Sequence, residues 1–119
     1  MPKYIDGYLL PVPKKNIAAY KKLAKVASKV WRDHGALDYR ECVGEDFNAF
    51  CGIGFPKQLK LRKDETLIFA YIVFRSRAHR DRVNRKAMSD PRLAAFATQK
   101  MPFDVDRMLY AGFSTIVGD

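Results

Sequence analysis

The sequence has few cysteines and histidines and lacks nucleotide-binding motifs, which excludes several kinds of site. Only two cysteines occur, Cys42 and Cys51, and neither belongs to a CxxC pair or to a Cys/His ligand set. A disulfide framework or a zinc site is therefore the less favoured interpretation. The two histidines are far apart and lack HExxH spacing, so no metal centre is expected. No GxGxxG or GxxxxGK[ST] pattern is present, and no cofactor is predicted.

Long apolar runs are also missing. The run from Leu67 to Phe74 is too short for a membrane span and is rich in β-branched and aromatic residues, which favours a buried strand. The N-terminal apolar stretch is interrupted by Asp6 and ended by Pro11 and Pro13, which is unlike a secretory signal. A cytoplasmic location is therefore expected. With 119 residues, the sequence predicts one compact domain over residues 1–119.

Acidic residues are few: 13 Asp and Glu stand against 22 Lys and Arg, a net charge of +9. The positive charge is uneven, because seven cationic residues lie between Lys14 and Arg32 and six between Arg75 and Lys86. Two basic helices of this kind suggest a module that binds the phosphates of RNA or DNA. Their polar faces carry no aromatic residues for base stacking, so a plain solvated basic surface is the favoured interpretation.

Apolar periodicity predicts four strands and two main helices. Ile17, Tyr20 and Leu23 begin an amphipathic pattern that ends near Gly35, and Ser76 is suited to cap a second helix. Gly44 to Glu65 shows no sustained period and predicts a long loop. The predicted strands are 4–10, 37–43, 67–74 and 107–117, the predicted helices are 17–31 and 77–84, and a short helix is expected near residues 93–97.

This order, β-α-β-β-α-β, predicts an α+β fold. With right-handed crossovers it gives the ferredoxin-like sandwich, a four-stranded antiparallel sheet with both helices on one face. The first, third and last strands carry large apolar residues in both phases, which such a sheet normally avoids. The second face must therefore be covered, and a homodimer joined sheet to sheet is expected.

Four segments identify a family resemblance. They read YIDGYLLPVPKKNIAAYKKLA, VWRDHGALDYREC, YIVFRSRAHRDRVNRKAMSDPR and MPFDVDRMLYAGF. They closely resemble the YbaA-like bacterial "domain of unknown function" family of the dimeric α/β-barrel superfamily, over nearly the whole chain. The resemblance implies a ferredoxin-like dimer of the dimeric α/β-barrel type and carries no established activity. Enzymes of the wider superfamily commonly use the space between sheet and helices, which is an analogy of fold only.

Two carboxylates are candidate catalytic residues. Asp6 is an ionisable group inside an otherwise apolar strand, where burial raises the pKa of a carboxyl and a nearby cation opposes that shift. Arg107, in the neighbouring last strand, is the expected cation. A salt-bridged or edge-exposed aspartate is the favoured alternative. Glu41, on the second strand, is a similar candidate, for which the exposed-edge alternative is stronger still.

The third catalytic candidate is His79. It could act as a general base, or bind an anion together with Arg77 and Arg80 at the start of the second helix, where unpaired amides favour negative charge. A capping or packing histidine among solvated arginines is the favoured alternative. His34 is expected to interact with the C-terminal carbonyls of the first helix.

Two classes of function follow. The first is a small cofactor-independent enzyme or small-molecule-binding protein, with a pocket near the sheet that is lined by Tyr, Phe and Met and has Asp6 as its polar group. The alternative is a basic module that binds RNA, DNA or another polyanion without sequence specificity. The sequence leaves open whether the protein is an enzyme. It predicts neither a substrate nor a membrane partner.

Overall fold

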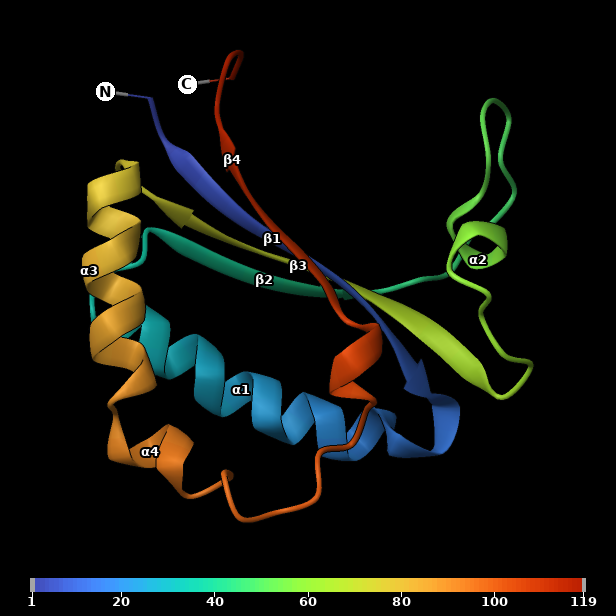
Figure 1. Ribbon diagram of the computed structural model, residues 1–119, viewed down its shortest axis with the longest axis horizontal. Coiled ribbons are helices and arrows are strands. Elements are labelled where there is room, and N and C mark those ends of the chain that lie inside the picture. The colour runs from blue at the N-terminus through green and yellow to red at the C-terminus, as the bar shows by residue number, and fades with distance from the viewer. Residues whose placement is uncertain (1, 119) are drawn as a thin grey trace.

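A four-stranded antiparallel sheet carries the main helices on one of its faces (Figure 1). The computed structural model describes residues 2–118. The strand order across the sheet is β2-β3-β1-β4. In chain order the elements are β1 (Tyr4–Pro13), η1 (Lys14–Asn16), α1 (Ile17–Asp33), β2 (Asp38–Val43), α2 (Phe55–Gln58), β3 (Glu65–Phe74), α3 (Arg77–Met88), α4 (Pro91–Ala94), η2 (Val105–Arg107) and β4 (Leu109–Ser114). The predicted α+β class is confirmed.

β1 is longer than predicted. It continues to Pro13, so the predicted end at residue 10 is wrong, and of the two prolines predicted to end the strand only Pro13 does so. β4 pairs with β1 only as far as Leu9, opposite Leu109, whereas β3 pairs with β1 to its end. Beyond Leu9, β1 therefore has a neighbour on one side only, where the missing N–H of a proline costs no ladder hydrogen bond.

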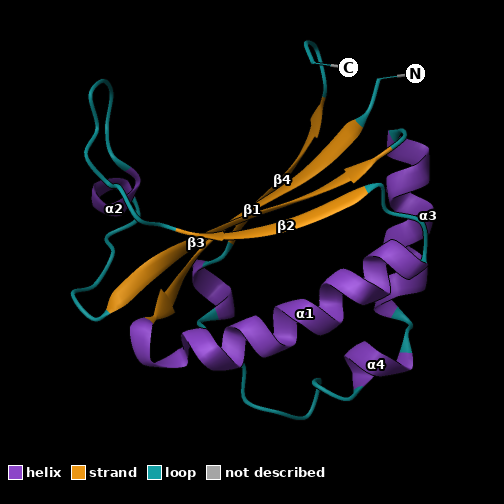
Figure 2. Cartoon of the chain, turned by 180° about the vertical axis from the view of Figure 1, so that it is seen from behind, coloured by secondary structure: helices purple, strands orange, loops and turns teal. Residues whose placement is uncertain are grey.

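α1 lies across one face of the sheet (Figure 2). Its residues Tyr20, Ala24, Val30 and Trp31 are buried, while its lysines face outward. Gly35 follows the helix with a φ of +117°, as expected of the glycine predicted to end it. No helix within residues 2–118 is long and apolar enough to cross a membrane.

The core lies between the sheet and the helices. Ile68, Ala70, Ile72 and Phe74 of β3 alternate toward the helices and are buried. The opposite face is different: Phe69 is 48% exposed, so the helices of the single chain cover only one face of β3. We call this apolar side the free face. By strand register it is formed by Ile5, Gly7, Leu9, Phe69, Tyr71, Val73, Leu109, Ala111 and Phe113.

The segment between β2 and β3, residues 44–64, forms an arm. It was predicted as a loop and contains one short helix, α2. In both views the arm rises from the side of the sheet away from α1 (Figures 1 and 2). Phe50 at 99% and Ile53 at 67% are among its most exposed side chains. Phe55 lines a shallow hollow together with Phe69 and Phe113, so the arm borders the free face.

Candidate functional site

A cavity of about 200 Å³ lies between α1 and the sheet. We call it the Glu41 cavity. Its walls are mostly aromatic and aliphatic side chains, as in most ligand-binding pockets. The lining residues are Tyr8, Leu10, Tyr20, Leu23, Ala24, Ala27, Trp31, Tyr39, Glu41, Ala70, Ile72, Leu93, Met101, Phe103 and Met108. The predicted lining of Tyr, Phe and Met is therefore present, but Asp6 is not part of it.

Small side chains create this space. α1 presents Ala24 and Ala27 to the cavity, and β3 presents Ala70. Because an alanine fills little of the distance between a helix and a sheet, three of them at one place leave a void that larger residues would close. Such a void costs stability, since its walls lose packing contacts.

The strand register aims Glu41 into the cavity. Glu41 lies opposite Ala70, and Tyr39 lies opposite Ile72. Directly opposed residues share a face, and both β3 residues belong to the buried, helix-facing set. Glu41 therefore lines the cavity as a half-buried residue. The expectation of an exposed carboxylate at the sheet edge is wrong.

Two tyrosines hold the Glu41 carboxylate. Tyr20 Oη donates a hydrogen bond to Oε1 at 2.7 Å, and Tyr39 Oη donates to Oε2 at 2.8 Å. Burial raises the pKa of Glu41, and the two hydroxyl donors oppose that rise without cancelling it. Each carboxylate oxygen accepts several hydrogen bonds, so capacity for a ligand donor remains. A carboxyl with a raised pKa in an apolar pocket is suited to acid–base chemistry.

The neighbouring phenols keep their protons. Burial first, and then the charge of Glu41, raises the pKa of Tyr20 and of Tyr39 far above the ordinary value of 10.0. Burial also raises the pKa of Tyr8, and nearby Asp6 adds to the effect. At neutral pH Tyr20 and Tyr39 therefore act as hydrogen-bond donors to the Glu41 carboxyl, and Tyr8 lines the same cavity as a neutral phenol.

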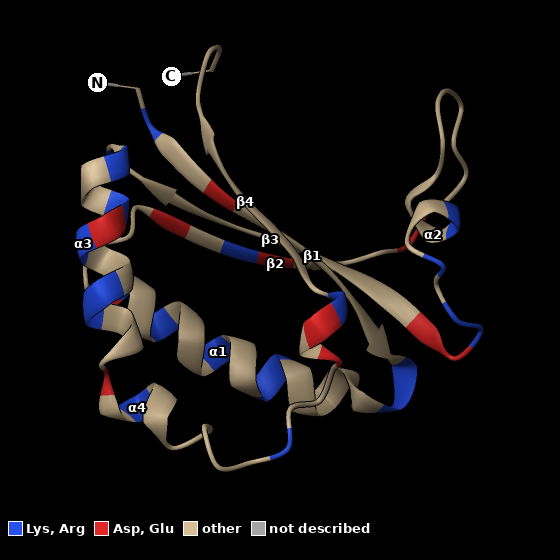
Figure 3. Cartoon of the chain, viewed as in Figure 1, with Lys and Arg blue, Asp and Glu red and all other residues tan. Residues whose placement is uncertain are grey.

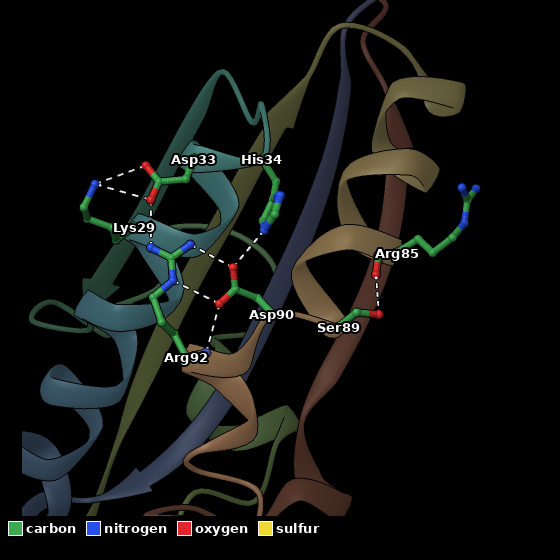
Figure 4. A network of polar contacts seen from close by, with 7 residues as sticks. All are labelled: Lys29, Asp33, His34, Arg85, Ser89, Asp90 and Arg92. Atoms are coloured by element: carbon green, nitrogen blue, oxygen red, sulfur yellow. Dashed lines mark hydrogen bonds and ion pairs between the residues drawn. The ribbon is translucent and has the colours of Figure 1, made fainter.

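A polar network anchors α4 against the end of α1 (Figure 4). Arg92 Nη1 donates to Asp33 Oδ2 at 2.7 Å, and Arg92 Nη2 donates to Asp90 Oδ2 at 2.8 Å. His34 Nε2 lies 2.8 Å from the same Asp90 oxygen. The His34 backbone N–H donates to Val30 O at 3.1 Å, so the predicted interaction with the carbonyls that end α1 is made by the backbone, while the ring contacts Asp90. Leu93, which follows Arg92 directly, lines the Glu41 cavity. The network therefore holds one wall of the cavity in place.

Asp6 belongs to a separate buried network. Its side chain is fully buried, and Arg80 Nη1 donates to Oδ1 at 2.7 Å. Asn84 Nδ2 donates to the other oxygen at 3.1 Å, and Trp31 Nε1 donates to Asn84 Oδ1 at 2.9 Å. Arg107 instead pairs with Glu65, so its predicted partnership with Asp6 is wrong. The position of Asp6 fits a carboxylate that holds α3 to β1.

The three residues of the predicted anion site do not converge. His79 is buried, and its Nδ1 accepts a hydrogen bond from the Arg75 backbone N–H at 3.0 Å. Burial lowers the pKa of His79, and the charges of two nearby arginines lower it further. Arg80 is engaged by Asp6, whereas Arg77 is exposed. Ser76 Oγ accepts the His79 backbone N–H at 3.1 Å, as expected of the predicted cap.

Sequence reasoning missed Tyr20 and Tyr39 as partners of Glu41. One signal was available for Tyr39, because positions two apart in a strand share a face. Nothing local in the sequence links Tyr20 to them, since only the packing of α1 on β2 brings it within hydrogen-bonding distance. Within residues 2–118, no three His, Cys, Asp or Glu residues are placed to hold a metal ion.

Comparison with known proteins places the chain among relatives of its own length. A family model described as "Protein of unknown function (DUF1428)" matches residues 3–105. The "Uncharacterized protein YbaA" of Escherichia coli (strain K12) is 36% identical over 117 residues, covering 98% of this chain and 99% of the relative. The protein of the same name from Shigella flexneri matches equally well. These matches confirm the resemblance to YbaA-like proteins of unknown function that the four sequence segments predicted.

Proposed function

The chain belongs to the DUF1428 family of proteins of unknown function, and we propose that it binds a small molecule in the Glu41 cavity. The observation that carries this proposal is an acidic side chain with a raised pKa, held by two tyrosines inside an apolar pocket. A dry apolar cavity of about 150 Å³ accommodates benzene. A single ring or a short chain therefore matches the volume.

Glu41 is the acid–base group of the proposed site. It accepts a proton from a bound ligand or donates one, while Tyr20 and Tyr39 stabilise the carboxylate form by hydrogen bonding. Proton transfer of this kind needs no cofactor, so the site is compatible with a cofactor-independent enzyme. If no turnover accompanies binding, the same geometry serves a binding protein, in which Glu41 selects ligands that carry a hydrogen-bond donor.

A fragment screen by two-dimensional NMR tests the proposal. Single-ring fragments should shift the amide signals of Tyr39, Glu41 and Ala70. Ala27→Phe should abolish these shifts because the new ring fills the cavity, whereas Ala18→Phe, on the exposed side of the same helix, should preserve them. Binding that is unchanged by Ala27→Phe, or that maps elsewhere, would overturn the proposal.

We also propose that the domain is ferredoxin-like and dimerises through the free face. The strand order β2-β3-β1-β4, with α1 and α3 on one side, supports the fold. An exposed apolar sheet face drives association, and Phe69, Leu109 and Phe113 are each about half exposed there. The arm adds exposed apolar residues on the same side, so a second copy would contact both the free face and the arm.

A basic module that binds RNA or DNA phosphates remains the alternative. Lysines line the outward side of α1 (Figure 3). Among the described residues of α1, Lys21, Lys22 and Lys25 form no ion pair. Fluorescence anisotropy with labelled RNA and DNA at two salt concentrations tests it, because phosphate contacts weaken steeply with salt. Absence of salt-sensitive binding would exclude it.

A further inference from the structure

A second, larger hollow lies next to the Glu41 cavity. It has a volume of about 620 Å³ and lies between the N-terminal half of α1 and the segment 96–102. Leu23 and Met101 line both spaces, so these two side chains lie between them. We call the outer space the lysine groove. It is lined by Lys15, Asn16, Ala19, Lys22, Leu23, Phe96, Gln99, Lys100, Met101 and Pro102.

The charge of the lysine groove has one sign. Lys15, Lys22 and Lys100 line it, and no Asp or Glu does. Within residues 2–118, none of these three lysines forms an ion pair with an acidic side chain. Three ammonium groups around a concave surface attract an anion, because a cleft with charge of one sign concentrates its field.

The inner space has the opposite polarity. Glu41 is the one carboxylic acid among its lining residues, and Tyr20 and Tyr39 beside it keep their protons. A ligand anion placed next to the Glu41 carboxylate would meet like charge in an apolar setting, which is strongly unfavourable. An apolar group with a hydrogen-bond donor suits that end instead. The two spaces together therefore orient a ligand.

We infer that the ligand is an amphipathic organic anion, which places an apolar ring or chain in the Glu41 cavity and a carboxylate or phosphate among Lys15, Lys22 and Lys100. This inference rests on the proposed function and adds the chemical class of the ligand. Leu23 and Met101 lie where the ligand passes from one space to the other. Methionine is flexible and adapts to irregular shapes, so Met101 suits that position.

A matched pair of probes tests the inference. The dissociation constants of 3-phenylpropionate and of its uncharged analogue 3-phenyl-1-propanol are measured by NMR titration of the full chain at low salt. The carboxylate should bind about tenfold more tightly, because it makes several partly solvated charge contacts with the lysine ammonium groups. Lys22→Gln/Lys100→Gln should remove that difference. Lys21→Gln/Lys25→Gln, with the same loss of charge on exposed positions outside the groove, should preserve it.

The outcomes separate this inference from the proposed function. Equal binding of both probes in the Glu41 cavity, or a carboxylate preference unaffected by Lys22→Gln/Lys100→Gln, overturns the anion inference and leaves the cavity as a ligand site. If neither probe binds while the fragment screen finds ligands in the cavity, the ligand class is overturned and the proposed function stands. If neither probe nor any fragment binds the cavity, both are overturned.

Discussion

Arg80 Nη1 lies 2.7 Å from Asp6 Oδ1, and this ion pair joins α3 to the central strand β1 in the interior of the domain. The Asp6 side chain is fully buried, and that of Arg80 is only 13% exposed. Arg80 also lies over the Tyr4 ring, 4.8 Å from its centre. A buried pair with so many partners has a structural role, because losing either member leaves the other charged and without its main partner.

Asp6→Asn should lower the free energy of unfolding by about 3–5 kcal/mol, the usual cost of removing one partner from a buried pair. Urea denaturation measures this directly. Asp81→Asn is the control, since Asp81 contacts Arg80 Nε at 2.8 Å but is itself 53% exposed. Its loss should cost less than about 1 kcal/mol. Similar values for the two variants would contradict a structural role for Asp6.

The raised pKa of Glu41 predicts a pH dependence of stability. The folded protein holds this proton more tightly than the unfolded chain, whose ordinary value is 4.5. The stabilising contribution is therefore fully present below about pH 4.5 and is lost as the pH rises through the folded pKa. Glu41→Gln resembles the protonated form, so its stability relative to wild type should increase from about pH 4 to about pH 7.

Urea denaturation across that pH range measures the effect. Glu45→Gln is the matched control, because Glu45 is exposed in the arm. It removes one negative charge at an exposed position and so controls for the change in net charge. A Glu41→Gln profile parallel to wild type would show that the pKa of Glu41 is not raised.

Asp90 should affect the pH dependence of stability in the opposite direction, at acidic pH. Hydrogen bonds from the Arg92 side chain and backbone, and from His34, hold the pKa of Asp90 well below its usual 3.8. Its contribution is therefore present above about pH 4 and is lost as the pH falls. Asp90→Asn should destabilise the protein near neutral pH and flatten the acid limb of the stability profile. Asp64→Asn, at an exposed position, should do neither.

Phe69→Lys should prevent dimerisation. It places a charge in the middle of the free face, where a lysine would be desolvated by a second copy. Met88→Lys, at a 72% exposed apolar residue at the end of α3, is the control and should leave the dimer intact. Sedimentation velocity gives the oligomeric state. Wild-type protein that remains monomeric at micromolar concentration would refute the proposed interface.

The sequence predicted the strands and main helices because their signals are local. A short uninterrupted apolar run predicted β3, Ser76 provided a cap, and Gly35 ended α1. The strand length beyond Pro11 was missed, since it depends on where β4 stops. That is a long-range property.

The candidate site was only partly predictable. Glu41 was identified as a candidate, but a charged residue on an edge strand is usually exposed to solvent, so its burial was not predicted. Its burial depends on Ala24, Ala27 and Ala70, which leave room between helix and sheet. No local pattern shows that these three alanines meet. Asp6 was identified because it is an ionisable residue in an otherwise apolar strand. Its partners on α3 could not be predicted, because they depend on the packing of that helix on β1.

The most direct test of the central claim is a ¹³C NMR titration of the side-chain carboxyl carbons of Glu41 and Glu45, with and without a single-ring fragment. The pKa of Glu41 should lie above the ordinary 4.5, because burial disfavours its charge, and it should change when the fragment binds. Glu45, which is exposed in the arm, is recorded in both samples as the reference signal. A Glu41 pKa at the ordinary 4.5 that does not respond to any fragment would contradict the proposal that this carboxyl serves a ligand-binding cavity.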